Sequence, residues 1–217
     1  MFKNILLSAG LMAAVMAPAI HAESAETVTR RHSIKSDGIA ALDIDAGVGS
    51  VRVEPGSTAN YELTVTIEPA KKGWFGKRAD VSTSKVKIVR RGDRLELSLD
   101  PDSVDGGSLQ GTWRVKLPIP APAAVEVDLG VGEARIEAPT SAVRLDVGVG
   151  EAKVITRLDS AGQVSAAAGV GDASISGTEA ARDRHVVGGQ SSGQGQGERE
   201  VKVNVGVGEA GVTLTRE

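Results

Sequence analysis

The stretch Val125-Glu-Val-Asp-Leu-Gly-Val-Gly-Glu-Ala-Arg-Ile136 decides the fold, because the chain repeats its pattern. Alternating apolar and polar residues lead into a Gly-Val-Gly triplet, and an acid and a second short alternation follow it. Repetition of this kind organises a whole fold, so it is interpreted first. Four further copies lie at 42–53, where Ser50 replaces the acid, and at 143–154, 164–175 and 201–212.

Each copy is predicted to form two short strands joined at a corner. Val125, Val127 and Leu129 share one face of a strand, whereas the apolar residues after the triplet are Ala134 and Ile136. The alternation has slipped by one residue, which indicates a bulge or corner. Glycine supplies the positive φ or the close backbone approach that a corner requires, and the central valine is expected to fill the corner from inside. The predicted corner residues are Gly47, Gly49, Gly130, Gly132, Gly148, Gly150, Gly169, Gly171, Gly206 and Gly208.

The spacing of the triplets predicts how the copies are arranged. Spacings of 18 and 21 residues suit one coil of a parallel β-solenoid per copy, and a spacing of 37 suits two coils, one of them degraded. Residues 42–53 would be the first coil, 60–118 an antiparallel β-hairpin insertion in the N-terminal half, and 119–217 the C-terminal coils. The stretch 188–197 is rich in Gly, Gln and Ser and is predicted to be a mobile loop. The expected fold class is therefore all-β.

The start of the chain predicts export. Residues 1–22 resemble a secretory signal peptide, with Lys3, an apolar stretch and small residues up to Ala22, so residues 23–217 would be a single β-repeat domain. The chain has no cysteine, which excludes disulfides, thiolate chemistry and a lipid-modified cysteine. No later segment approaches the roughly 20 apolar residues of a membrane helix. The prediction is a periplasmic or secreted protein that is not lipid-anchored.

The chain resembles the putative-adhesin family of β-strand-repeat proteins of bacterial envelopes. The resemblance is carried by the opening copy at 42–53, by the hairpins after it, and by Arg114-Val-Lys-Leu-Pro-Ile-Pro120 leading into the later copies. It covers residues 39–214 and implies a right-handed solenoid and an exported location. "Adhesin" is a label in this family, and no shared catalytic residues come with it.

Calcium binding is the second hypothesis. Glycine-rich coils that carry acids bind Ca²⁺ in β-rolls. The tandem glycine-rich pattern of a β-roll is missing here, and Arg135 and Lys153 can neutralise neighbouring acids, so a solvated, charge-paired edge is favoured. The acids expected to stack in one column are Glu133, Glu151, Asp172 and Glu209.

An enzyme is the third hypothesis. Residues 206–211 formally match the dinucleotide pattern G-x-G-x-x-G, but the residues after them alternate as a strand, whereas the motif needs a helix. His32 and His185 lack a serine in a strand-to-helix elbow and are predicted to lie at the surface. The net charge of −3 gives no bias toward nucleic acid. No catalytic residue, cofactor or metal ligand is assigned.

One segment has a distinctive chemistry. Lys71-Lys-Gly-Trp-Phe-Gly-Lys-Arg78 combines four cations with two of the few aromatic residues, between two predicted strands. This composition favours an anionic lipid or another polyanion, although the aromatic side chains could instead fold back onto the sheet. The candidate binding residues are Lys71, Lys72, Trp74, Phe75, Lys77 and Arg78. The leading hypothesis is thus a non-catalytic envelope protein that binds or scaffolds an unknown envelope component.

Overall fold

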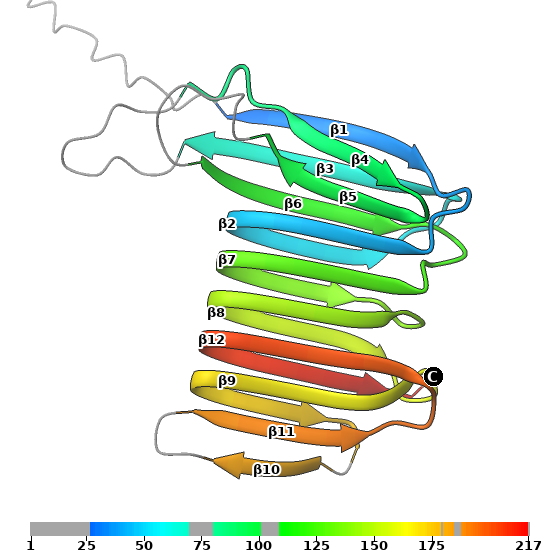
Figure 1. Ribbon diagram of the computed structural model, residues 1–217, viewed down its shortest axis with the longest axis vertical. Coiled ribbons are helices and arrows are strands. Elements are labelled where there is room, and N and C mark those ends of the chain that lie inside the picture. The colour runs from blue at the N-terminus through cyan, green and yellow to red at the C-terminus, as the bar shows by residue number, and fades with distance from the viewer. Residues whose placement is uncertain (1–26, 70–79, 101–108, 179, 185–187, 217) are drawn as a thin grey trace, which may run out of the picture.

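Strands make up all the regular secondary structure in the residues that the computed structural model describes, which are 27–69, 80–100, 109–178, 180–184 and 188–216. The predicted all-β class is confirmed, and the handedness of the coil stays a prediction. The strands in Figure 1 are β1 (Val28–Lys35), β2 (Ala41–Pro55), β3 (Asn60–Pro69), β4 (Val86–Arg91), β5 (Arg94–Leu99), β6 (Leu109–Leu117), β7 (Ala124–Glu137), β8 (Ala142–Arg157), β9 (Ala161–Ser176), β10 (Ala180–Arg184), β11 (Gly189–Gln194) and β12 (Arg199–Thr215).

Five of these strands are bent, and each contains one copy of the repeat. They lie side by side in the order β2, β7, β8, β12, β9, and each runs parallel to its neighbours. Their triplets are in register: Val48 is opposite Val131, Val131 opposite Val149, Val149 opposite Val207, and Val207 opposite Val170. Equivalent residues therefore form columns across the stack, about 4.8 Å apart from strand to strand.

The bends divide the stack into two layers, which meet along the edge at the left of Figure 1. The first layer holds the half of each bent strand before its triplet, extended by β5 and β4 at one end and by β11 and β10 at the other. The second layer holds the half after the triplet, extended by β6, β3 and β1. One apolar core of mostly Val, Leu, Ile and Ala fills the space between the layers.

Residues 60–118, predicted as an antiparallel insertion, form a cap that extends both layers. β3 pairs antiparallel with β6, and β4 with β5 across a turn at Gly92 and Asp93. β5 and β6, however, run parallel to the two halves of β2. Trp113 and Tyr61, the largest fully buried side chains of the described residues, lie in this cap.

The last strand does not take the last place in the sheet. β12 lies between β8 and β9 and pairs with both, although β8 and β9 follow each other directly in the chain. The spacing of 37 residues between the last two triplets is therefore not a degraded coil. Instead it contains β10 and β11, which lie beyond β9, and the return of the chain to the place beside β8.

The predicted mobile loop at 188–197 is wrong for most of its length, because Gly189–Gln194 is β11, paired antiparallel with β9. Side-chain size explains the error. Gly189 and Ser191 are buried opposite Ala168 and Ala166, where larger side chains would have little room, and the Ser191 hydroxyl donates to the carbonyl of Ala173 at 3.1 Å. Composition indicated a linker, but small residues also suit a thin part of a core.

Candidate functional site

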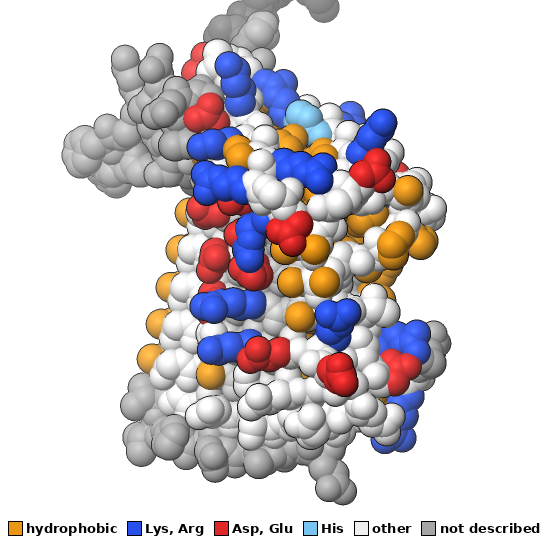
Figure 2. All heavy atoms as spheres, turned by 45° about the vertical axis from the view of Figure 1, so that its right-hand side comes forward, with side chains coloured by type: hydrophobic (Ala, Val, Ile, Leu, Met, Phe, Trp, Pro, Cys, Tyr) orange, Lys and Arg blue, Asp and Glu red, His pale blue; other side chains and the backbone are white. Residues whose placement is uncertain are grey.

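The bent edge carries a column of exposed valines. Val48, Val131, Val149, Val170 and Val207 are 41–47% exposed, so the expectation that they fill the corner from inside is wrong. Figure 2 shows hydrophobic side chains repeated along this edge, at the left of the view. Leu129 and Ala134 already close the core in β7, and the residues between them cross from one layer to the other on the outside.

The two glycines of a triplet are required for different reasons. The second glycine of each copy has a positive φ, 141° at Gly132, in a region that favours glycine. A Cβ there would also overlap the carbonyl oxygen of Gly49 on the neighbouring strand. The first glycine, Gly130, lacks a positive φ, but its Cβ would lie 2.5 Å from the carbonyl oxygen of Gly47.

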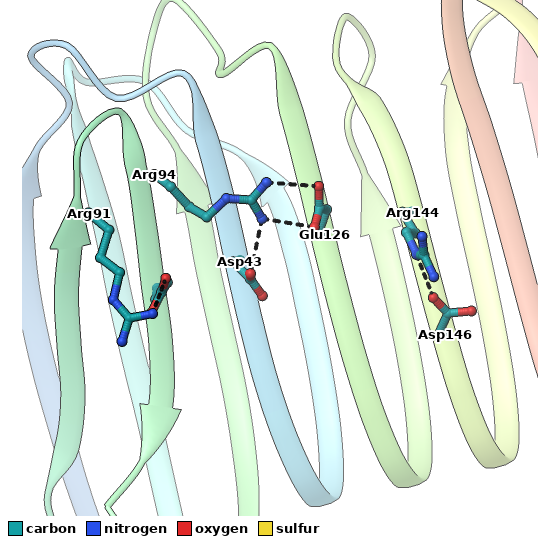
Figure 3. Close-up of polar contacts among 7 residues, drawn as sticks. Asp43, Arg91, Arg94, Glu126, Arg144 and Asp146 are labelled. Carbon is teal, nitrogen blue, oxygen red and sulfur yellow. Dashed lines mark hydrogen bonds and ion pairs between the residues drawn. The ribbon is translucent and has the colours of Figure 1, made fainter.

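The outer face of the first layer carries interleaved acids and cations (Figure 2). Arg94, at the start of β5, bridges two neighbouring strands by donating to Asp43 at 3.1 Å and to Glu126 at 2.9 Å (Figure 3). The hydrogen bond from Arg94 holds the pKa of Glu126 below its usual value, and the two carboxylates raise the pKa of Arg94. This cluster joins the cap to the bent strands.

A column of carboxylates lies beside that cluster. Asp45, Asp128 and Asp146 are in register with Asn204, and they line a shallow groove of about 570 Å³. Burial, with repulsion from Asp146, Asp43 and Asp45, raises the pKa of Asp128. Burial also opposes ionisation of Asp146, but hydrogen bonds from Asn204 and Arg144 outweigh it and lower the pKa of Asp146. The negative charge of Asp128 is thus less compensated than that of Asp146.

The outer face of the second layer has two parallel columns of side chains, and the members of both columns on β6, β2, β7 and β8 line a groove of about 330 Å³. One column is made of cations and the other changes from hydroxyl groups to acids along the stack. The cations are Arg114, Arg52, Arg135 and Lys153, and the second column is Thr112, Ser50, Glu133, Glu151, Glu209 and Asp172.

The outcome differs from one sequence-predicted site to the next. The candidate binding residues at 71–78 lie outside the described residues. The acids after the triplets do share one column, but no group of three or more His, Asp or Glu in the described residues is arranged to hold a metal ion. Residues 206–211 form extended strand in β12. His32 lies in β1 and is half-buried, with its Nε2 atom buried.

The cation column is the feature that the sequence interpretation missed. Three of its members, Arg52, Arg135 and Lys153, occupy the same position of the repeat, and each lies two residues before or after an acid. The fourth, Arg114, lies in β6, which has no Gly-Val-Gly triplet. A usable signal was present, since Gly111-Thr-Trp-Arg-Val115 matches the second half of the first copy, Gly49-Ser-Val-Arg-Val53.

No protein-family model matches the sequence, and no curated protein matches it. Solved structures with a similar fold include two bacterial proteins. A "putative cell adhesion protein" from Clostridium sporogenes has 16% identity and a TM-score of 0.51, covering 88% of this chain and 100% of that chain. A "putative adhesin" from Bacteroides fragilis has 13% identity and a TM-score of 0.38, covering 88% and 97%. The Clostridium structure shows that this chain shares its fold with an all-β bacterial protein.

Proposed function

We propose that the chain is a non-catalytic, exported protein of a bacterial envelope that binds or scaffolds an envelope component, as an adhesin does. The observation that carries the proposal is the in-register stack, which arranges equivalent outward residues of the repeat in columns over several strands. Such a surface suits an extended or repetitive partner better than a small substrate. The name of the Clostridium structure, a "putative cell adhesion protein", supports the same class of function.

One feature of the proposal comes from the sequence and another from the family resemblance. Residues 1–22 act as the export signal and are removed, and the coil is right-handed. No helix of the described residues is long and apolar enough to cross a membrane. Mass spectrometry of protein recovered from culture supernatant and from the periplasm would test both the cleavage after Ala22 and the compartment.

Binding can be measured with residues 23–217 immobilised and incubated with fractionated bacterial envelopes. We expect saturable retention of an envelope component that heat-denatured protein does not retain. Absence of saturable retention from every fraction would contradict the proposal.

The segment 71–78 is proposed as a second contact, with anionic lipid. Its four cations would each contribute about 1 kcal/mol near an anionic surface, and Trp74 would insert at the headgroup level. Replacing Trp74 and Phe75 by Ser should abolish binding to anionic vesicles without unfolding the chain. Destabilisation with no vesicle binding to lose would instead show that these aromatic side chains pack in the core.

A further inference from the structure

One strand breaks the charge pattern of the second layer. In the bent strands, each cation of the column has an acid two residues away: Arg52 pairs with Glu54 at 3.0 Å and Arg135 with Glu137 at 2.8 Å. Lys153 likewise pairs with Glu151. These pairs matter because like charges on adjacent strands repel each other.

In β6 the corresponding neighbours of Arg114 are Thr112 and Lys116, neither of which is an acid. Lys116 already pairs with Glu62 on β3 at 3.2 Å. Arg114 is exposed and makes no ion pair within the part of the chain that the structure describes. One uncompensated guanidinium therefore lies next to Arg52 in the cation column.

Residues with hydroxyl groups occupy several positions next to Arg114 in the sheet. Thr64 on β3 is directly opposite Arg114, and Thr112 is opposite Ser50 on β2. The groove of about 330 Å³ passes over Thr112 and Ser50 and continues along the stack to Glu133 and Glu151. Its β6 end is thus cationic and rich in hydroxyl groups, whereas its β8 end contains carboxylates.

We propose that this groove binds an acidic polysaccharide in which charged and neutral sugars alternate. A guanidinium matches a carboxylate with two parallel hydrogen bonds, so Arg114 and Arg52 would hold the uronic acid. Glu133 and Glu151 would accept hydrogen bonds from the hydroxyl groups of the neighbouring sugar. The same carboxylates would repel a polymer charged at every unit. The inference rests on the proposed binding function and specifies its ligand class.

The test uses residues 23–217 and a fluorescent hyaluronan octasaccharide, whose sugars alternate between uronic acid and neutral amino sugar. Arg114→Ser removes the uncompensated cation. Thr112→Glu gives β6 the acid that β7 has at the same position, so that it neutralises Arg114 without removing it. Each variant should weaken binding about tenfold or more, the loss expected for one charge-assisted contact. Matched controls are Arg199→Ser and Gln163→Glu, both exposed and outside the groove, which should bind as the unmodified chain does.

Oligogalacturonate of equal length, charged at every sugar, should bind more weakly than hyaluronan, and neutral dextran should not bind. Failure to bind hyaluronan, equal binding of oligogalacturonate, or equal losses in variants and controls would each overturn the inference. Circular dichroism of every variant checks that the fold is kept. If the unmodified chain retains the envelope component but does not bind hyaluronan, the ligand class is wrong and the proposed function stands.

Discussion

At the scale of single residues, the Gly-Val-Gly triplet works as a link between layers rather than as part of the core. The valine is exposed, and the glycines are required by backbone contact with the next strand and by a positive φ. Neighbouring copies therefore restrict each other's triplets. Where a neighbour is missing, the restriction should disappear.

The first prediction compares a triplet glycine that has a close backbone neighbour with one that has none. Gly132→Ala should lower the free energy of unfolding by about 1–3 kcal/mol, because a Cβ at positive φ would also overlap the carbonyl oxygen of Gly49. Gly47→Ala is the matched control, since a Cβ there meets no atom within 4 Å, and it should change stability by no more than about 0.5 kcal/mol. Chemical denaturation measures both, and equal losses would contradict this account of the bend.

The second prediction concerns Asp128. Its pKa is raised in the folded state, so the ionised carboxylate costs stability above that pKa, and the cost is relieved as the pH falls through it. Asp128→Asn should stabilise the fold at neutral pH by about 0.2–1 kcal/mol, the usual range for a cross-strand pair.

The gain from Asp128→Asn should vanish in acid, where the native carboxyl is protonated, as thermal melts across the acid range would show. Asp37→Asn, in an exposed turn, is the control and should give no pH-dependent gain. A gain that persists unchanged in acid would show that repulsion is not its cause.

At the scale of elements, the notable feature is the place of β12. It is the single strand between β8 and β9, and it forms backbone pairs with both. Its core residues Val203 and Val212 are buried as fully as those of the central copies. A C-terminal strand at the edge of a sheet would have one free side and would fray.

The third prediction follows from that place. In native-state hydrogen exchange, the amides of residues 201–214 should be among the slowest in the chain, because opening them requires two neighbouring strands to separate. The amides of β1, whose one partner among the described strands is β3, should exchange faster. Fast exchange throughout β12 would place this strand at an edge, as the order of the copies in the sequence suggests.

At the scale of the whole molecule, each outer face shows a regular change of charge along the stack. On the second layer, the column beside the cations begins with Thr112 and Ser50 and ends with Glu209 and Asp172. The cation column itself ends at Lys153 on β8, because Gly211 takes the next place on β12. The fourth prediction tests whether this acidic end binds calcium.

Chelation should leave the melting temperature and the β-type circular dichroism of the chain unchanged. A site that bound calcium would stabilise the folded state through the binding equilibrium, by about 2.7 kcal/mol at a hundredfold excess over its Kd. Glu209→Gln is the informative variant, since it removes a central acid of the column. The calcium-dependent hypothesis would replace the leading one if millimolar calcium raised the melting temperature by many degrees and Glu209→Gln abolished this rise.

The repeat by itself determined the all-β class, the position of the bends and the stacking of equivalent residues. These features depend on the local alternation of apolar and polar residues and on the identical spacing around each triplet. Both are visible in 125–136 and its copies. The same information identified Arg135 and Lys153 as cations beside the acids, but not the column that they form with Arg52. Arg114 was harder to find, since β6 carries only half of a copy.

The tertiary structure alone decided which copy lies beside which, and on which side of the bend the valines lie. Parallel pairing uses backbone hydrogen bonds that every copy offers equally, so nothing in 201–212 favours β8 and β9 as its neighbours over an edge. Likewise, the slip in alternation shows that a bend exists, but whether Val131 points inward depends on how Leu129 and Ala134 of both layers fill the core. Sequence periodicity reports the face of a strand, whereas the choice of neighbour depends on the whole stack.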